Sequence, residues 1–195
     1  IPPKSLMIFN DTQVIPSKLN GFLVNNARPI EILLLNKTSE ENHWESLIKG
    51  LGKLRLGEEM EFGNGALKAI LVNRQKDKAI LKLMYEGQLS PILKRIGKMP
   101  LPPYIRRDLN KTENFSDLDR ERYQTVFAKN TGAIAAPTAG LHFTPYIIES
   151  LKKQRIDLAY LTLHVGVGTF QPIRTENIAE HKMQKEQFHI PQNTS

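Results

Sequence analysis

Short apolar runs separated by turn-forming residues constrain the fold of this chain more than any other feature. Between residues 30 and 84 the runs are IEILLL, EMEF, ALKAILV and KAILKLM, and the breaks include Gly57, Gly63-Asn64-Gly65 and the stretch 73–77. Runs this short, bounded by glycine, asparagine and aspartate, are typical of strands rather than helices. The GNG and NRQKD segments each join two runs, which predicts two hairpins. We therefore expect a small antiparallel β-barrel here.

The second half of the chain has a different pattern. The segment GAIAAP is followed by TPYIIESLKKQ and then by DLAYLTLHV. Thr144 and Pro145 are suited to the N-cap and first position of a helix, so the order predicts strand, helix, strand. A unit of this length is a parallel crossover, and its two strands end at one edge of a sheet. The segments PTAGLHF and HVGVGTF are expected to be loops at that edge, with His142 and His164 on them.

Three further elements are predicted between these regions. PILKRIG indicates a short helix with Gly97 at its C-terminus, and the prolines of MPLPPYIRRDL indicate an extended connector that leaves the barrel. A helix capped by Ser116 or Asp117 is expected to end near Gly132.

Composition narrows the class of protein. The chain has 195 residues, 40% of them hydrophobic and 24% charged, which is enough for a globular core. The absence of cysteine excludes disulfides and thiolate chemistry. The formal net charge of +7 favours a polyanionic partner such as nucleic acid, although each basic cluster by itself is more often a solvated surface. No apolar run is long enough to span a bilayer and the start lacks a secretion signal, so we expect a soluble, cytoplasmic protein without membrane contact.

Several common site motifs are missing. The sequence has no P-loop, no H-E-x-x-H and no G-x-S-x-G, and the glycines of VGVGTF do not match the dinucleotide-binding spacing. The spacing of His142, His164 and His181 gives no support for metal ligation, so no metal is expected.

Five blocks carry a family resemblance. They are NDTQVIPSKLNG from Asn10, MPLPPYIRR from Met99, RYQTVFAKNTGAIAAPTAGLHFT from Arg122, LTLHVGVGTFQP from Leu161 and EHKMQKE from Glu180. In this order they resemble the S-adenosylmethionine:tRNA ribosyltransferase-isomerase family of queuosine biosynthesis, often called QueA. The resemblance implies a mixed or parallel α/β domain formed by residues 1–16 and 101–195, into which an antiparallel β-barrel domain of residues 17–100 is inserted.

The resemblance also implies a reaction and its partners. The ribosyl part of S-adenosylmethionine, a co-substrate rather than a tightly bound cofactor, would be transferred and isomerised onto 7-aminomethyl-7-deazaguanine at the wobble position of tRNA. Epoxyqueuosine-tRNA would form, with release of adenine and methionine. We expect the protein to be monomeric.

Site residues follow from matching this chemistry to the blocks. A sulfonium makes the ribose C5′ protons acidic, so a general base is needed, and the candidates are His142 and His164. His181 is a third candidate catalytic residue. Candidates for holding S-adenosylmethionine are Thr138, Ala139, Gly140, Gly166, Gly168 and Thr169. Candidates for contacting tRNA by stacking, phosphate contact or hydrogen bonds are Asp11, Tyr104, Arg106, Arg107, Tyr123 and Gln124, although buried tyrosines are commonly core residues.

Departures from the family pattern keep a second hypothesis open. Gln13 stands where a basic residue is usual, and Gln184 stands where the E-H-x-M-H-x-E block usually has a histidine. An N-terminal segment and a C-terminal part of the family are also expected to be absent from this chain. The alternative to an active transferase is therefore a non-catalytic RNA-binding fragment or a decayed relative.

Overall fold

The computed structural model describes residues 1–75, 77–105, 116–170, 175–181 and 183–195. The chain divides into two compact units, one formed by residues Ile1–Ile15 and Leu101–Ser195 and the other by Pro16–Pro100. We call them the α/β unit and the barrel unit and describe each by itself. Among the described residues, no helix is both long enough and apolar enough to cross a membrane.

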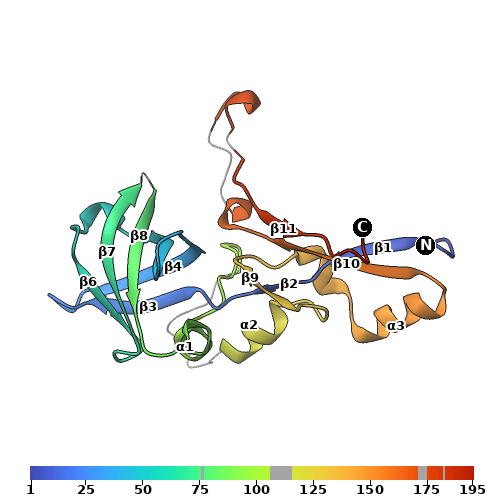
Figure 1. Cartoon of the computed structure of the whole chain (residues 1–195), viewed down its shortest axis with the longest axis horizontal. Helices are drawn as coiled ribbons and strands as arrows, with labels where there is room; N and C mark the ends of the chain where they lie inside the picture. The colour runs from blue at the N-terminus through green and yellow to red at the C-terminus, as the bar shows by residue number, and fades with distance from the viewer. Residues whose placement is uncertain (76, 106–115, 171–174, 182) are drawn as a thin grey trace. The chain divides into compact units, whose positions relative to one another are not determined.

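The barrel unit is a closed antiparallel barrel with strand order β3-β4-β5-β8-β7-β6 (Figure 1). Pairing of β3 with β6, for example Gly21 with Phe62, closes it. The predicted hairpins are present, because β6 pairs with β7 across Gly63-Asn64-Gly65 and β7 pairs with β8. The predicted barrel is thus confirmed. Its strands are β3 (Lys18–Leu23), β4 (Pro29–Lys37), β5 (His43–Ile48), β6 (Glu59–Phe62), β7 (Leu67–Gln75) and β8 (Lys78–Met84), and a 3-10 helix, η1 (Leu51–Lys53), follows β5.

Alternating side chains of these strands fill the barrel. Leu19, Phe62, Leu71 and Leu81 are almost completely buried, as expected when every second residue of a strand points inward. Helix α1 (Leu89–Ile96) adds Ile92 and Leu93 to the same core.

Gly97 is the C-cap of α1, as the sequence predicts, but its backbone is extended, with φ of −82°. A Cβ atom at this position would collide with the carbonyl oxygens of Pro16 and Leu93. Close approach of the backbone, rather than a left-handed conformation, is therefore what requires glycine here.

The α/β unit contains two small sheets that share one segment of chain. In the first, β1 (Leu6–Asn10) pairs in parallel with β10 (Asp157–His164), which pairs antiparallel with β11 (Gln187–His189). In the second, β2 (Thr12–Val14) pairs in parallel with β9 (Asn130–Ala133). Asp11 lies between β1 and β2, so this residue stands where the two sheets meet.

This topology corrects two expectations. The strands on either side of helix α3 (Pro145–Lys153) do not share one sheet, because β9 and β10 pair with β2 and β1, and not with each other. The apolar run LMIFN near the start of the chain forms β1 and takes the expected place beside β10. The helix expected to reach Gly132 is α2 (Ser116–Arg122), and residues 130–133 form a strand because β2 supplies their hydrogen-bond partners.

One face of the first sheet carries the core of the α/β unit. The ring of Phe9 lies 4.8 Å from that of Phe127, 5.0 Å from Phe143 and 5.8 Å from Tyr160, measured between centroids. Leu151 of α3 packs on the same cluster. Helix α3 begins as the sequence predicts, since the hydroxyl of Thr144 accepts a hydrogen bond from the amide of Ile147. Among the described residues of the unit there are also three 3-10 helices, η2 (Thr138–His142), η3 (Val167–Phe170) and η4 (Ile178–Glu180).

Candidate functional site

The backbone of Asp11 joins three segments of the α/β unit. Its amide donates to the carbonyl of Leu161 in β10, and its carbonyl accepts from the amides of Lys129 and Asn130. The first sheet thus ends at Asn10 and the second begins at Thr12. The backbone of Asp11 is hydrogen-bonded to one strand of each sheet, to β10 in the first and to β9 in the second. The side chain of Asn10 supports this break, because its Oδ1 accepts from the amides of Thr12 and Leu163.

The carboxylate of Asp11 is the centre of a buried polar cluster. The residue is only 7% exposed, and its Oδ1 accepts a 2.6 Å hydrogen bond from the hydroxyl of Thr162. The amide nitrogen of Asn130 lies 3.1 Å from both carboxylate oxygens and 2.9 Å from the Thr162 oxygen. A buried carboxylate is tolerated when it is hydrogen-bonded in this way.

His164 ends β10 next to this cluster. Its Nδ1 lies 2.7 Å from the hydroxyl oxygen of Thr12. Burial lowers the pKa of the imidazole below its ordinary value, and the nearby charge of Asp11 partly opposes that effect. Gly132 lies against the ring, since a Cβ there would be 2.7 Å from Nε2. The structure therefore holds a half-buried imidazole that favours its neutral form, with one nitrogen engaged by Thr12.

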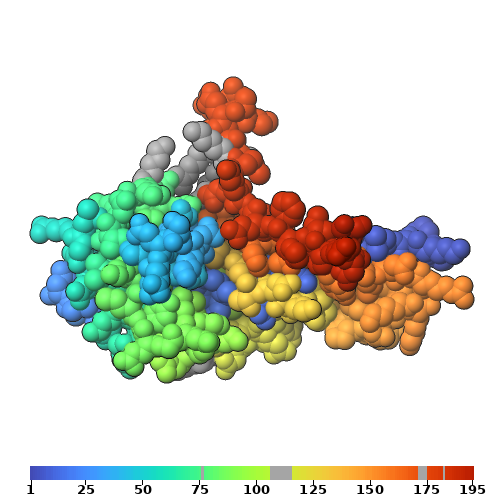
Figure 2. Space-filling model, viewed as in Figure 1, coloured from blue at the N-terminus to red at the C-terminus, as the bar shows by residue number. Residues whose placement is uncertain are grey.

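A pocket of about 390 Å³ has Asp11 in its lining. Its lining comes from the Asp11 junction, from β10 and from the C-terminal residues, which lie against β10 in the space-filling view (Figure 2). The lining residues are Asp11, Phe127, Lys129, Leu158, Ala159, Tyr160, Pro191, Asn193 and Thr194.

The first predicted loop is a 3-10 helix. His142 is exposed on η2, with Nδ1 3.2 Å from the carbonyl oxygen of Ala139. The amide of Gly140 donates to the carbonyl of Pro137, so this amide is engaged within its own turn. Thr138 and Ala139 are exposed. A Cβ on Gly140 would lie 2.8 Å from Thr125 and 3.1 Å from Phe127, which ties this turn to a ring that lines the pocket.

The second predicted loop also forms a 3-10 turn, η3. The amide of Gly166 donates to Oε1 of Glu186 at 2.8 Å, and a Cβ on Gly168 would lie 3.3 Å from the side chain of Gln184. Thr169 is exposed, and His181 follows η4 as its C-cap. Gln184 and Glu186 of the last resemblance block therefore pack on the glycine-rich turn.

Backbone hydrogen bonds link the approaches to the two turns. The amides of Ile134 and Ala135 both donate to the carbonyl of Val165, at 2.9 and 3.2 Å. The chain leading to η2 and the chain leading to η3 are therefore neighbours, although β9 and β10 belong to different sheets. Hydrogen bonds connect the segment of Asp11 with that of His164, because Thr12 bonds to His164 and Thr162 bonds to Asp11. The roles of His142, His181 and the two turns stay predictions.

The residues predicted to contact tRNA differ in exposure. Tyr104 is 74% exposed, whereas Tyr123 is buried and burial raises the pKa of its phenol. Gln124 uses both ends of its amide on the backbone of Val14, accepting at 3.0 Å and donating at 2.8 Å. Arg106 and Arg107 lie outside the described residues. Of these candidates, Tyr104 has the surface that base stacking requires.

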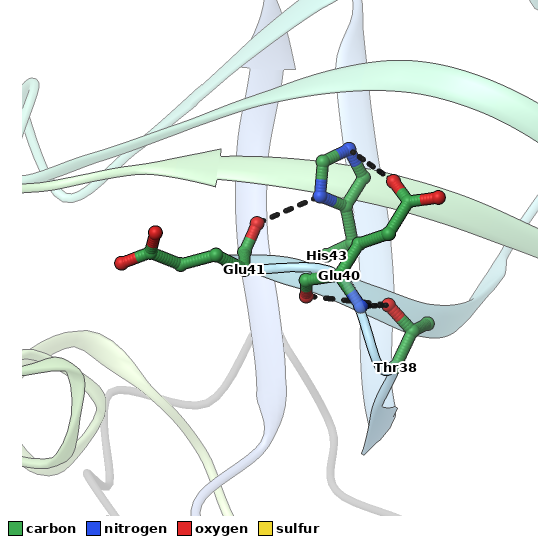
Figure 3. Close-up of polar contacts among 4 residues, drawn as sticks. All are labelled: Thr38, Glu40, Glu41 and His43. Carbon is green, nitrogen blue, oxygen red and sulfur yellow. Dashed lines mark hydrogen bonds and ion pairs between the residues drawn. The ribbon is translucent and has the colours of Figure 1, made fainter.

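The barrel unit contains a histidine with a different environment. At the turn between β4 and β5, Nδ1 of His43 lies 2.7 Å from the carbonyl oxygen of Glu41, and Nε2 lies 3.5 Å from the carboxylate of Glu40 (Figure 3). Thr38 accepts from the amide of Glu40 in the same turn. These contacts make His43 part of a hairpin turn. Within the described part of the chain, no group of three histidine or acidic side chains is placed to hold a metal ion.

Sequence reasoning missed Thr12, Asn130 and Thr162. Each is a polar residue within or beside an apolar strand segment, such as Thr162 in LTLH, and an unexplained polar residue in a buried strand is the signal that points to such a cluster. The partners themselves are set by pairing between segments more than 100 residues apart, which the sequence does not reveal.

Comparison with known proteins gives three similarities. The model of the queuosine biosynthesis protein family matches residues 1–195. An S-adenosylmethionine:tRNA ribosyltransferase-isomerase of Halothermothrix orenii is 41% identical over 191 residues, which are 97% of this chain and 53% of that protein. The chain thus spans about half the length of this relative. The crystal structure of an S-adenosylmethionine tRNA ribosyltransferase from Thermotoga maritima is 26% identical, covers 85% of this chain and 42% of its own, and has a TM-score of 0.34.

Proposed function

Because this chain belongs to the queuosine biosynthesis protein family, we propose that it acts in the transfer of the ribosyl group of S-adenosylmethionine to tRNA. The acceptor is 7-aminomethyl-7-deazaguanine at the wobble position, and the ribosyl group is isomerised to give epoxyqueuosine-tRNA with loss of adenine and methionine. The relative from Halothermothrix orenii carries the name of this activity.

The observation that carries the chemical part of the proposal is the environment of His164. The reaction needs a base that is neutral near pH 7, because only the neutral imidazole accepts a proton. Burial lowers the pKa of His164, which maintains that form, and the hydroxyl of Thr12 engages Nδ1. We assign to Nε2 the removal of a proton from ribose C5′, where the sulfonium acidifies the C–H bond. The imidazole carries that proton and the electron pair stays on carbon.

His142 and His181 are the other candidates for proton transfer. His142 is exposed and bonded within its own turn, and His181 caps η4 beside the block that contains Gln184. A role for either in returning a proton to a leaving group is compatible with these positions. The hydroxyls of Thr138 and Thr169, both exposed, are our candidates for the ribose hydroxyls.

The test is release of adenine and methionine from S-adenosylmethionine in the presence of tRNA that carries the precursor base. We expect His164→Gln to lower the rate about 10² to 10⁴-fold, the usual contribution of a general base, while tRNA binding is unchanged. His43→Gln is the matched control, because His43 lies in a hairpin turn of the barrel unit. Equal rates for the His164 and His43 variants would refute the assignment.

The second candidate function is RNA binding without turnover. It is favoured by one observation, the glutamine at position 184 beside Gly168. An amide does not transfer protons as imidazole does. If the chain binds the tRNA but releases neither adenine nor methionine under conditions in which the full-length relative does, this second function is correct and the first is not.

A further inference from the structure

We infer that Asn10 is a positioning residue that sets the separation between the hydroxyl of Thr12 and the imidazole of His164. The inference rests on the proposed function for what His164 does in the reaction, whereas its geometry depends only on contacts within the α/β unit. Asn10 is the last residue of β1 and is half-buried. It therefore lies where the chain leaves the first sheet and begins the second.

The backbone pairing between β1 and β10 ends at Asp11, whose amide donates to the carbonyl of Leu161 at 2.9 Å. Leu163 lies two residues further along β10, so its amide and carbonyl point to the same edge of the strand. If β1 continued, the carbonyl of Asp11 would accept from the amide of Leu163. That carbonyl instead accepts from the amides of Lys129 and Asn130, at 2.8 and 3.1 Å. The parallel ladder thus needs another group opposite Leu163.

The side chain of Asn10 takes that place. Its Oδ1 accepts from the amide of Leu163 at 2.9 Å, and its Nδ2 donates to the carbonyl of Leu163 at 2.9 Å. The same Oδ1 accepts from the amide of Thr12 at 3.1 Å. A carboxamide carries an acceptor and a donor on one plane, so it imitates the peptide group of a further strand residue. One side chain therefore bonds to the backbone on both sides of the junction.

The two backbone partners of Asn10 place the contact between Thr12 and His164. Thr12 carries the hydroxyl whose oxygen lies 2.7 Å from Nδ1 of His164. The carbonyl of Leu163 belongs to the peptide group that joins Leu163 to His164, so the bond from Nδ2 of Asn10 holds that peptide group in place. Because the partner of Nδ1 decides which ring nitrogen carries the proton, a change in this separation changes the state of Nε2.

A purely structural role for Asn10 is the competing explanation. The three hydrogen bonds would stabilise the junction of the two sheets whatever His164 does. On that explanation, a substitution of Asn10 lowers the stability of the fold but leaves the imidazole unchanged in the molecules that remain folded. The state of the His164 ring in a folded variant therefore separates the two explanations.

Two substitutions remove different parts of the contact. Asn10→Asp keeps both acceptor oxygens and loses only the donor to the carbonyl of Leu163. Asn10→Leu has a similar size, removes all three hydrogen bonds and adds no charge. Asn26→Asp is the matched control, because Oδ1 of Asn26 accepts from the amide of Arg28 in an exposed turn of the barrel unit. Circular dichroism shows which variants fold.

The first measurement is the ¹⁵N NMR spectrum of the His164 ring at pH 8. We expect one tautomer in the parent chain and in Asn26→Asp, and a mixture of tautomers in both Asn10 variants. The second is release of adenine from S-adenosylmethionine with precursor tRNA, which we expect each Asn10 variant to lower by about 10 to 10²-fold, the usual effect of misplacing a reacting group. In a His164→Gln background the same substitutions should not lower the residual rate further, because Asn10 acts through His164.

Three results would overturn the inference. They are the parent tautomer in a folded Asn10 variant, an equal fall in rate with and without His164, and fast hydrogen exchange at the amides of Thr12 and Leu163 in the parent chain. The exchange measurement needs no substitution, so it decides the matter even if neither Asn10 variant folds, and slow exchange supports the inference. If the tautomer changes as expected but the parent chain releases no adenine, the positioning role of Asn10 stands and the proposed catalysis fails.

Discussion

The hydroxyl oxygen of Thr12 lies 2.7 Å from Nδ1 of His164, and the two residues come from opposite ends of the sequence. Thr12 starts the second sheet of the α/β unit and His164 ends the central strand of the first. A hydroxyl at this distance selects one tautomer of the imidazole and fixes the plane of the ring. Orientation of the proposed base therefore depends on the junction at Asp11.

The first prediction concerns the hydroxyl of Thr12. Thr12→Val keeps a branched side chain but leaves Nδ1 without its partner, so we expect a lower rate of adenine release and a mixture of His164 tautomers in ¹⁵N NMR spectra. Thr12→Ser restores the hydroxyl and should restore both the rate and the single tautomer. A valine variant with the parent tautomer would show that another group orients the ring.

The second prediction concerns pH. Burial lowers the pKa of His164 in the folded chain, whereas the unfolded chain titrates near the ordinary value of about 6.5. The unfolded state therefore binds more protons as the pH falls through that value. The stability that the neutral imidazole contributes is complete above pH of about 6.5 and is lost towards the lower pKa of the folded state. In urea unfolding between pH 7.5 and 5, we expect His164→Gln to lose less stability than the parent chain; an identical loss would contradict the shift.

The third prediction concerns the space beside the ring. A methyl group on Gly132 would lie 2.7 Å from Nε2 of His164, so Gly132→Ala must displace the imidazole or the strand. We expect a decrease in the free energy of unfolding of about 1 to 3 kcal/mol. Gly52→Ala is the matched control, because a Cβ there meets no atom within 4 Å. Thermal or urea unfolding of the two variants gives the comparison, and equal stability would mean that the ring is more mobile than the packing indicates.

The fourth prediction concerns the polar cluster. Asn130→Ala removes the amide that bonds to both oxygens of Asp11 and to Thr162. Because the carboxylate is buried, we expect a loss of about 1 to 3 kcal/mol in the free energy of unfolding, measured with urea. Thr131→Ala is a suitable neighbour for comparison, since its hydroxyl bonds to Gln13 in an exposed pair. If both substitutions lower the free energy of unfolding equally, the polar cluster contributes no more to stability than an exposed hydrogen bond does.

The fifth prediction concerns tRNA. Tyr104 is 74% exposed, and stacking of an unpaired base on an aromatic ring contributes about 1 to 3 kcal/mol. We expect Tyr104→Ala to weaken tRNA binding by that amount in a filter-binding assay. Tyr146→Ala serves as the control, because Tyr146 is also exposed, at 82%, but lies on α3. Equal affinities of the two variants would remove Tyr104 from the interface.

The barrel strands and helix α3 were predictable because their signals are local. Turn residues at Gly63-Asn64-Gly65 and the cap at Thr144 act over a few residues, and the structure confirms both. The pairing of β9 and β10 was predicted wrongly, because proximity in sequence was the only guide. The LMIFN run competes for the same place beside β10, and only the complete set of contacts decides which strand takes it.

The amino-acid sequence determined the strand meander, the capped helix, the absence of thiol chemistry and the blocks that identify the family, since each depends on residue type and near spacing. Only the tertiary structure decided that Asp11 meets Thr162 and Asn130, that Thr12 engages His164, and that a pocket lies beside them. The physical reason is distance along the chain. Hydrogen bonds of 2.6 to 3.1 Å between residues 119 to 152 positions apart exist only after β1, β2, β9 and β10 have paired.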